Sequence, residues 1–361
     1  MHINVTKPSV PNKKKFLSYL NILYQTRMLT TNGKLVKILE NKLKKKFGVK
    51  YLLLTCNGTI SLEIALKALG IKKGVLTSPF SYISTPNACN WLNLNVEFSD
   101  IEKKYYTLDI KKINKKKLDK VDCILPTHVF GIEANIEEIC KLAKKKGKKI
   151  IFDAAHCFGI KYKDKSILSY GDANILSFQA TKIFNTCEGG AIIFKKKKDY
   201  LYAKQLINIG YRYDIKNFLP REGINAKMSE LNAAWGLALL KNFNEVMAKK
   251  RILFNYYAKN LNDSSIKIIN LPFKHNYNYV PALFSSKKIK ELVEFGLKKK
   301  RIYPRRYFYP SLNTLDHFKM KKMPVSEDVS NRILCLPLYE GLDKKIIDVI
   351  ISKIKFYEKK L

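Results

Sequence analysis

Short apolar segments alternate with helical patterns between about residues 48 and 195, and this alternation limits the folds that the chain can adopt. Seven strands are predicted, at Val49–Thr55, Gly74–Ser78, Val96–Asp100, Cys123–Pro126, Ile150–Asp153, Asn174–Phe178 and Ala191–Phe194. Helices are predicted between several of them, at Gly58–Leu69, from Ser84 or Thr85 onward, and at Ile136–Lys146. Crossover helices of this kind cover both faces of a parallel sheet. We therefore predict an α/β fold, with a mostly parallel seven-stranded sheet sandwiched by helices.

The sequence pattern changes beyond residue 228. A long helical pattern covers Ser229–Leu261 and contains a bend, and two further helices are predicted at Lys287–Leu297 and Asp343–Glu358. The strand and helix signals are mixed in this part of the chain, which favours a smaller α+β domain. We place a large α/β domain with an N-terminal arm at residues 1–240, and the small C-terminal α+β domain at residues 241–361.

A formal net charge of +38 raises the question of a nucleic-acid partner. The basic residues are nearly all lysine, whereas arginine is the usual reader of bases. They are also spread along surface-type segments such as Lys111–Lys120 and Lys141–Lys149. We interpret the excess as a compositional bias and expect no specific nucleic-acid partner. A basic exterior still attracts anionic metabolites such as nucleotide diphosphates.

The positions of the cysteines, histidines and apolar segments indicate the cellular compartment and bear on metal and membrane binding. The seven cysteines contain no C-x-x-C pair and several lie in apolar segments, which is typical of a reducing compartment. The five histidines have no metal-ligand spacing with them, so we expect no metal site. The first residues lack the apolar region of a signal peptide, and no apolar segment has the length of a membrane span. We expect a cytoplasmic protein without a membrane partner.

Lys182 stands alone in a lysine-rich chain, since no other lysine occurs between Lys165 and Lys195. The nearest charged residues along the chain are Asp172 and Glu188. Withdrawal from water disfavours the ammonium form and frees the amine as a nucleophile, which enzymes use to hold an aldehyde cofactor as a Schiff base. The alternative is a lysine whose charged end reaches the surface from an apolar strand.

Asp153 follows directly after a predicted buried strand, where a carboxylate needs a partner. A protonated pyridine nitrogen would serve, and the ionised aspartate would keep that ring an electron sink. His156, three residues later, could support the same ring. The alternatives are an aspartate that caps the next turn and a histidine with a structural role.

Further residues complete a candidate cofactor site. Gly58 and Thr59 open a predicted helix, whose free N–H groups and dipole favour a phosphate, and Ser177 could add a hydroxyl. Tyr82 could stack on a flat ring, although core packing also explains an aromatic residue there. All lie at or near the carboxyl ends of predicted strands, where sheets of this class bind ligands. Together with the lysine and the aspartate they predict a pyridoxal 5'-phosphate site without metal.

Motifs along nearly the whole chain carry a resemblance to a known family. They are Thr31–Lys34, Asn57–Thr59, Ser78–Thr85, Asp153–His156, Ser177–Lys182, Glu188–Ala191 and Gly223–Glu230, with weaker support from Tyr309–Pro310 and Leu336–Leu338. In these motifs the chain resembles the fold-type-I sugar-nucleotide aminotransferases of the DegT/StrS type. The resemblance implies an aspartate-aminotransferase-like fold, pyridoxal 5'-phosphate as cofactor, and a homodimer with shared active sites.

The resemblance also implies a role for each matched residue. Lys182 would be the Schiff-base lysine and the proton shuttle of a ping-pong transamination, and Asp153 would pair with the pyridine nitrogen. Tyr82 would stack on the cofactor ring and His156 would lie beside it. The phosphate ligands would be Gly58, Thr59, Ser177 and, from the neighbouring subunit, Asn225. Relatives that dehydrate a sugar carry histidine at the lysine position, so Lys182 argues against that branch.

The resemblance extends to the substrates. The segment from Ser177 to Gly190 is most similar to enzymes that aminate C4 of dTDP-4-keto-6-deoxy-D-glucose, with L-glutamate as donor, for surface polysaccharide or glycan biosynthesis. One alternative is an enzyme of the same family that aminates C3 or another keto-sugar nucleotide. The other is a non-catalytic protein that binds pyridoxal phosphate. Guanidinium groups suit both carboxylates and diphosphates, so Arg221, Arg305 and Arg306 are candidate substrate ligands, although each is equally ordinary as a surface charge.

Overall fold

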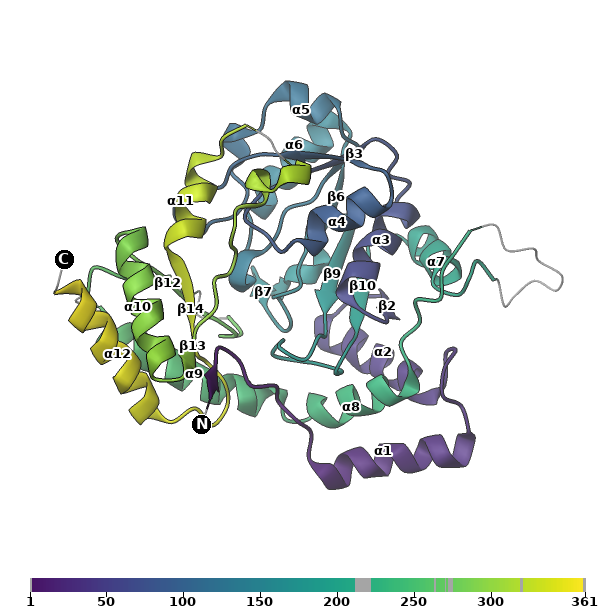
Figure 1. Cartoon of the computed structure of the whole chain (residues 1–361). Coiled ribbons are helices and arrows are strands. Elements are labelled where there is room, and N and C mark those ends of the chain that lie inside the picture. The colour runs from purple at the N-terminus through teal and green to yellow at the C-terminus, as the bar shows by residue number, and fades with distance from the viewer. Residues whose placement is uncertain are drawn as a thin grey trace.

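A mostly parallel sheet of seven strands forms the centre of the molecule (Figure 1). The structure is a computed structural model that describes residues 2–211, 222–262, 264–269, 271, 275–318 and 321–359. The strand order is β2 (Tyr51–Thr55), β10 (Gly190–Phe194), β9 (Ala173–Ser177), β6 (Lys149–Asp153), β5 (Cys123–Ile124), β3 (Gly74–Thr77) and β4 (Asn95–Phe98). All seven predicted strands are present. Only β10 runs antiparallel to its two neighbours, so the predicted, largely parallel sheet is confirmed.

Helices cover both faces of this sheet, as the alternation predicts. One face packs against α2 (Lys34–Phe47), α6 (Ile136–Lys146) and α8 (Glu230–Leu240), and the other against α3 (Gly58–Ala68), α4 (Ser84–Trp91) and α7 (Lys197–Leu206). Successive strand residues divide between the two cores, because side chains alternate across a strand. Leu52 and Leu54 lie in the α2 core, and Leu53 lies in the α3 core. α1 (Lys13–Thr26) packs on α8 at the edge of the molecule (Figure 1).

The C-terminal part of the chain builds a smaller antiparallel sheet. In it, β12 (Val280–Leu283) lies between β11 (Lys267–Ile268) and β14 (Ile333–Leu336). A third core surrounds this sheet and includes residues of α9 (Phe243–Asn260), α10 (Lys287–Lys299), α11 (Pro324–Arg332) and α12 (Lys344–Glu358). The predicted bend of the long helical pattern lies at residues 241–242, between α8 and α9. The domain boundary at residue 240 stays a prediction.

The beginning of the chain packs against its C-terminal part. β1 (Ile3–Asn4) pairs in parallel with β13 (Ile302–Tyr303), and the N–H of Ile3 donates to the carbonyl of Arg301 at 2.9 Å. The side chain of Ile3 is buried in the third core, together with that of Val5. Figure 1 shows the N-terminus beside β13.

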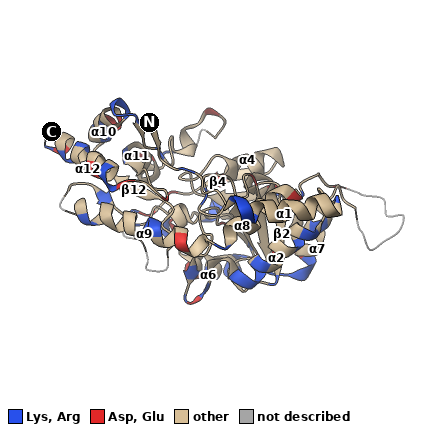
Figure 2. Cartoon of the chain, turned by 90° about the horizontal axis from the view of Figure 1, so that it is seen from below, with Lys and Arg blue, Asp and Glu red and all other residues tan. Residues whose placement is uncertain are grey.

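Basic residues are spread over many elements. Figure 2 shows lysine and arginine on helices at both ends of the molecule, among them α2, α9 and α12. The short helix α5 (Lys115–Asp119) and the hairpin of β7 (Lys161–Tyr162) with β8 (Lys165–Ser166) add further lysines. Within the described ranges, no helix is both long enough and apolar enough to cross a membrane.

Candidate active site

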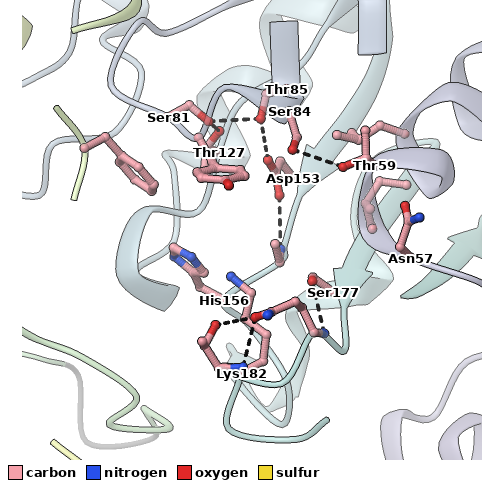
Figure 3. Close-up of a pocket in the computed structure, with 18 of the residues that line it drawn as sticks. Asn57, Thr59, Ser81, Ser84, Thr85, Thr127, Asp153, His156, Ser177 and Lys182 are labelled. Carbon is pink, nitrogen blue, oxygen red and sulfur yellow. Dashed lines mark hydrogen bonds between the residues drawn. The ribbon is translucent and has the colours of Figure 1, made fainter. Parts of the chain in front are cut away.

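A cavity of about 410 Å³ opens at the carboxyl ends of the parallel strands (Figure 3). Residues that follow β2, β3, β5, β6 and β9 line it, because these strands end at the same edge of the sheet. Among the lining residues are eight that were nominated from the sequence, namely Gly58, Thr59, Tyr82, Asp153, His156, Ser177, Lys182 and Arg305. The fold therefore brings together side chains that are separated by long stretches of sequence.

Three other residues that the sequence suggested as ligands either do not line the cavity or lie outside the described residues. Arg306 does not line the cavity, and its guanidinium forms an ion pair with Glu294 of α10 at 2.6 Å. Asn225 is exposed and outside this cavity, and its Oδ1 accepts a hydrogen bond from Lys227 Nζ at 2.7 Å. Arg221 lies outside the described residues.

The first turn of α3 forms one end of the cavity. Asn57 caps this helix, and its Oδ1 accepts a hydrogen bond from the N–H of Ile60 at 2.8 Å. Gly58 and Thr59 follow at the helix N-terminus, where unpaired N–H groups and the helix dipole favour an anion. A Cβ atom on Gly58 would lie only 3.0 Å from the Cβ of Ser177, so glycine allows α3 to approach β9 closely. This end of the cavity suits a phosphate.

The carboxylate of Asp153, at the end of β6, is buried beneath hydroxyl groups (Figure 3). Thr85 Oγ1 donates to its Oδ2 at 2.7 Å, and the N–H of Ala155 donates to its Oδ1 at 3.1 Å. Ser81 Oγ lies 3.0 Å from Thr85 Oγ1 and 2.9 Å from Thr127 Oγ1. Burial raises the pKa of Asp153, while the two hydrogen bonds and the nearby lysine charge lower it. A cationic partner in the cavity would therefore stabilise this carboxylate further.

Lys182 lies in the loop between β9 and β10, and its N–H donates to the carbonyl of Gln179 at 2.8 Å. Its Nζ reaches into the cavity and donates to the hydroxyl of Tyr279 at 3.5 Å. Burial lowers the pKa of Lys182 to about 8, with a smaller lowering by Arg305 and an opposing effect of Asp153. Near neutral pH this amine is therefore much closer to losing its proton than an ordinary lysine.

His156 lies beside the lysine (Figure 3), with its ring centroid 4.6 Å from that of Tyr279. Burial lowers the pKa of His156 well below its usual value, with further lowering by the Lys182 charge, so the ring is neutral. Its Nδ1 is buried and has no hydrogen-bond partner among the described residues. A buried polar atom of this kind is costly unless a ligand satisfies it.

Several residues of the site were not singled out from the sequence. Ser81, Thr85 and Thr127 build the hydroxyl network, and each follows a predicted strand, which could have marked them. Tyr279 contacts Lys182 across 97 positions of sequence, and no local pattern joins the two.

Comparison with known proteins identifies the family of this chain. The DegT/DnrJ/EryC1/StrS aminotransferase family matches residues 11–355. Two relatives are named dTDP-4-amino-4,6-dideoxy-D-glucose transaminase. The one from Shigella dysenteriae is 34% identical over 98% of this chain and 98% of its own, and the one from Escherichia coli is 36% identical over 96% of each.

A solved structure extends the likeness to three dimensions. The crystal structure of DesI in the presence of its TDP-sugar product superposes with a TM-score of 0.92 at 26% identity. The superposition covers 98% of this chain and 92% of that one. From the family match, the two relatives and this superposition, we conclude that the chain belongs to the DegT/DnrJ/EryC1/StrS aminotransferase family.

Proposed function

We propose that this aminotransferase transfers the amino group of L-glutamate to C4 of dTDP-4-keto-6-deoxy-D-glucose, with pyridoxal 5'-phosphate as cofactor. The two relatives named for the corresponding 4-amino sugar align over nearly their whole length, which supports the substrate. One observation supports the transamination chemistry. The Lys182 amine, with a pKa of about 8, shares a cavity with the buried carboxylate of Asp153.

The cavity residues fit pyridoxal phosphate at four places. The N-terminus of α3, with Gly58 against Ser177, suits the phosphate. The buried Asp153 gains from a protonated pyridine nitrogen, and the unpartnered Nδ1 of His156 gains from a polar group of the ligand. The Lys182 amine suits the aldehyde.

When bound, the cofactor supplies an aldehyde that bonds to amines and a ring that accepts electrons from the adjoining carbon. Asp153 would hold the ring nitrogen in its protonated form. Tyr82, whose side chain is 50% exposed at the cavity, would cover one face of the ring. The N–H groups of Gly58 and Thr59 and the hydroxyl of Ser177 would bind the phosphate.

Lys182 would carry the proton in both half-reactions. The neutral amine would accept a proton from the carbon that bears the donor's nitrogen, and the ammonium form would return it to the cofactor carbon on the other side of that nitrogen. In the second half-reaction the proton would move in the opposite direction. A pKa of about 8 makes both forms accessible near neutral pH, whereas the ordinary lysine value of 10.5 would leave almost no neutral amine. Burial therefore prepares this residue for a base role.

Arg305 is our candidate for the carboxylate of the amino donor. It is exposed at the cavity, and its guanidinium carbon lies 4.7 Å from the ring centroid of Tyr307. A planar guanidinium on a fixed aromatic face can bind a carboxylate through two parallel hydrogen bonds. Arg306 is the weaker candidate, because its guanidinium already pairs with Glu294.

We infer a homodimer in which each active site includes Asn225 from the second copy. Asn225 is exposed and does not line the cavity of its own chain. Large apolar side chains are exposed in the same region, at Tyr211 and Ile224, and on two helices, at Trp91 of α4 and Leu231 of α8. Exposed apolar side chains of this size favour burial against a partner.

The visible spectrum of the purified protein tests the cofactor and the role of Lys182. We expect a yellow chromophore that bleaches when L-glutamate is added. Borohydride reduction followed by peptide mapping should then place the covalent adduct on Lys182. Lys182→Ala should bind the cofactor non-covalently and lose turnover. An active Lys182→Ala enzyme, or an adduct elsewhere, would refute the assignment.

A second experiment tests the substrate. Purified enzyme is given L-glutamate with 4-keto-6-deoxy sugars linked to dTDP, GDP or UDP, and with a 3-keto analogue, and the products are identified by NMR. We expect the highest kcat/KM with the dTDP 4-keto sugar and an amine at C4. A preference for another nucleotide, or for C3, would replace the substrate and leave the transamination chemistry intact.

A further inference from the structure

A chain of polar side chains links Lys182 to helix α9 of the C-terminal part. The amine of Lys182 donates to the Tyr279 hydroxyl at 3.5 Å. The Asn278 side chain is close enough to this hydroxyl to lower the pKa of Tyr279, which burial raises, and Lys250 Nζ donates to Asn278 Oδ1 at 2.7 Å. Tyr279, Asn278 and Lys250 are only 2%, 2% and 6% exposed. The chain therefore runs through the interior of the molecule, where hydrogen bonds are strongest and an unpaired group is costly.

Lys250 is the unexpected member of this chain. Burying an ammonium group without a carboxylate is costly, and no ion pair to Lys250 occurs in the described part of the chain. Its neighbour Lys249 pairs with Glu245 at 2.7 Å and with Glu340 at 2.8 Å. Burial lowers the pKa of Lys250 to about 7, against a smaller opposing effect of Glu340. The contact that this buried amine makes is its hydrogen bond to the Asn278 side chain.

Contacts of the Tyr279 ring, as well as those of its hydroxyl, fix the position of this side chain. The ring packs against those of His156, at 4.6 Å between centroids, and Tyr307, at 5.7 Å. A phenol hydroxyl can accept a hydrogen bond from an ammonium group and donate one to a neutral amine. The group that faces Lys182 can therefore hold that amine in either protonation state.

We propose that Tyr279, fixed by Asn278 and Lys250, is a positioning residue that holds the Lys182 amine beside the reacting carbons while the amine is free. Lys250 orients the Asn278 amide by donating to its Oδ1, and the amide nitrogen is then left to face the Tyr279 hydroxyl. The inference rests on the proposed aminotransferase function. It adds a link from α9 to the chemistry, in a part of the chain that contributes none of the cofactor ligands named above.

Steady-state kinetics of four variants test this link. Tyr279→Phe keeps the ring and removes the hydroxyl, and Lys250→Met keeps the length of the side chain and removes the donor. We expect each to lower kcat about tenfold or more, with both KM values within about twofold, because a misplaced base slows the chemical step and leaves binding intact. The double variant should be no slower than Tyr279→Phe alone, because both changes act through one chain. Lys249→Met, the matched change at the neighbouring lysine, should keep the wild-type kcat.

The labelling of Lys182 in cofactor-free protein gives an independent measurement. Acetic anhydride modifies neutral amines, and peptide mass spectrometry follows Lys182 as the pH is raised. We expect half-maximal labelling near pH 8 in the wild type. In Tyr279→Phe the midpoint should move to lower pH, because the ammonium form loses an acceptor while Asp153, His156 and Arg305 still face it.

Either of two results would overturn the inference. The first is a Tyr279→Phe enzyme with the wild-type kcat and an unchanged labelling midpoint. The second is a double variant whose loss is the product of the two single losses, since Lys250 would then act independently of Tyr279. The labelling needs neither substrate nor cofactor, so it still reports on the chain if the assigned sugar is wrong. Equal thermal unfolding midpoints for all variants establish that the fold is retained.

Discussion

At the scale of single residues, the carboxylate of Asp153 depends on a hydroxyl from a different connection of the sheet. Thr85 lies in α4, after β3, and donates to Asp153 Oδ2 at the end of β6. Ser81 and Thr127 hold Thr85 in turn, since Ser81 Oγ lies within hydrogen-bond distance of both. The hydroxyl network thus orients a charged group that has little contact with water.

Replacing Thr85 by valine should weaken cofactor binding. The substitution keeps the shape of the side chain and removes one of the two donors to the carboxylate, so the pKa of Asp153 should rise and its attraction for a protonated ring nitrogen should fall. A hydrogen bond to a charged group contributes about 1.5–3 kcal/mol, so we expect the Kd for pyridoxal phosphate to rise about tenfold or more in an absorbance titration. Thr127→Val should have a smaller effect, because the Thr127 hydroxyl reaches the Asp153 carboxylate only through Ser81 and Thr85. An unchanged Kd in Thr85→Val would contradict this view of the network.

Sequence patterns could reveal some of these residues and not others. Lys182 is visible because it is isolated, and Asp153 because it ends an apolar strand. Thr85 and Tyr279 have common side chains in unremarkable surroundings, and their roles arise only when distant segments meet in the fold. Arg306 shows the ambiguity of a charge pattern, because a guanidinium that suits a substrate equally suits Glu294.

At the scale of elements, Glu230 joins two helices that are far apart in the sequence. It begins α8, is 1% exposed, and accepts hydrogen bonds from the N–H groups of Leu35 at 2.7 Å and Val36 at 3.1 Å. These are first-turn donors of α2, which have no partner within their own helix. A Cβ atom on Gly33 would lie 2.4 Å from the Glu230 side chain. Two motifs of the sequence, around Gly33 and Glu230, thus have one structural explanation.

Glu230→Ala should therefore destabilise the protein. It leaves two buried N–H groups of α2 without an acceptor, and the loss of such a cap costs about 2 kcal/mol. We expect a lower midpoint of urea unfolding and an unchanged cofactor spectrum, since Glu230 does not line the cavity. Glu245→Ala, at an exposed glutamate of α9, serves as the comparison and should leave the midpoint unchanged. If the two variants unfold at the same urea concentration, the cap has no role in stability.

The positions of the strands were easier to predict than their partners. Short apolar runs mark the strands of the large sheet, because all of them except the edge strand β4 contribute side chains to the cores on both faces. β10 runs antiparallel to β9 because the loop that contains Lys182 turns the chain back directly beside β9. The residues of β10 do not indicate this direction. The two-residue β1 was not predicted, because its pairing with β13 depends on tertiary contact alone.

At the scale of the whole molecule, the shared active site that we propose predicts complementation between two impaired variants. Lys182→Ala lacks the lysine, and Asn225→Ala lacks the phosphate ligand that we assign to the second copy. A mixed dimer would contain one site with both defects and one intact site. After subunit exchange we expect about a quarter of the wild-type activity, since half of the dimers are mixed and each has one working site. No recovery would mean that Asn225 serves its own chain or has no role.

The pairing of β1 with β13 has a consequence for biosynthesis. Ile3 is synthesised long before Ile302, so β1 has no pairing partner until β13 has emerged from the ribosome. The third core, which buries Ile3, Val5 and Ile302, cannot be completed before β13 has been synthesised.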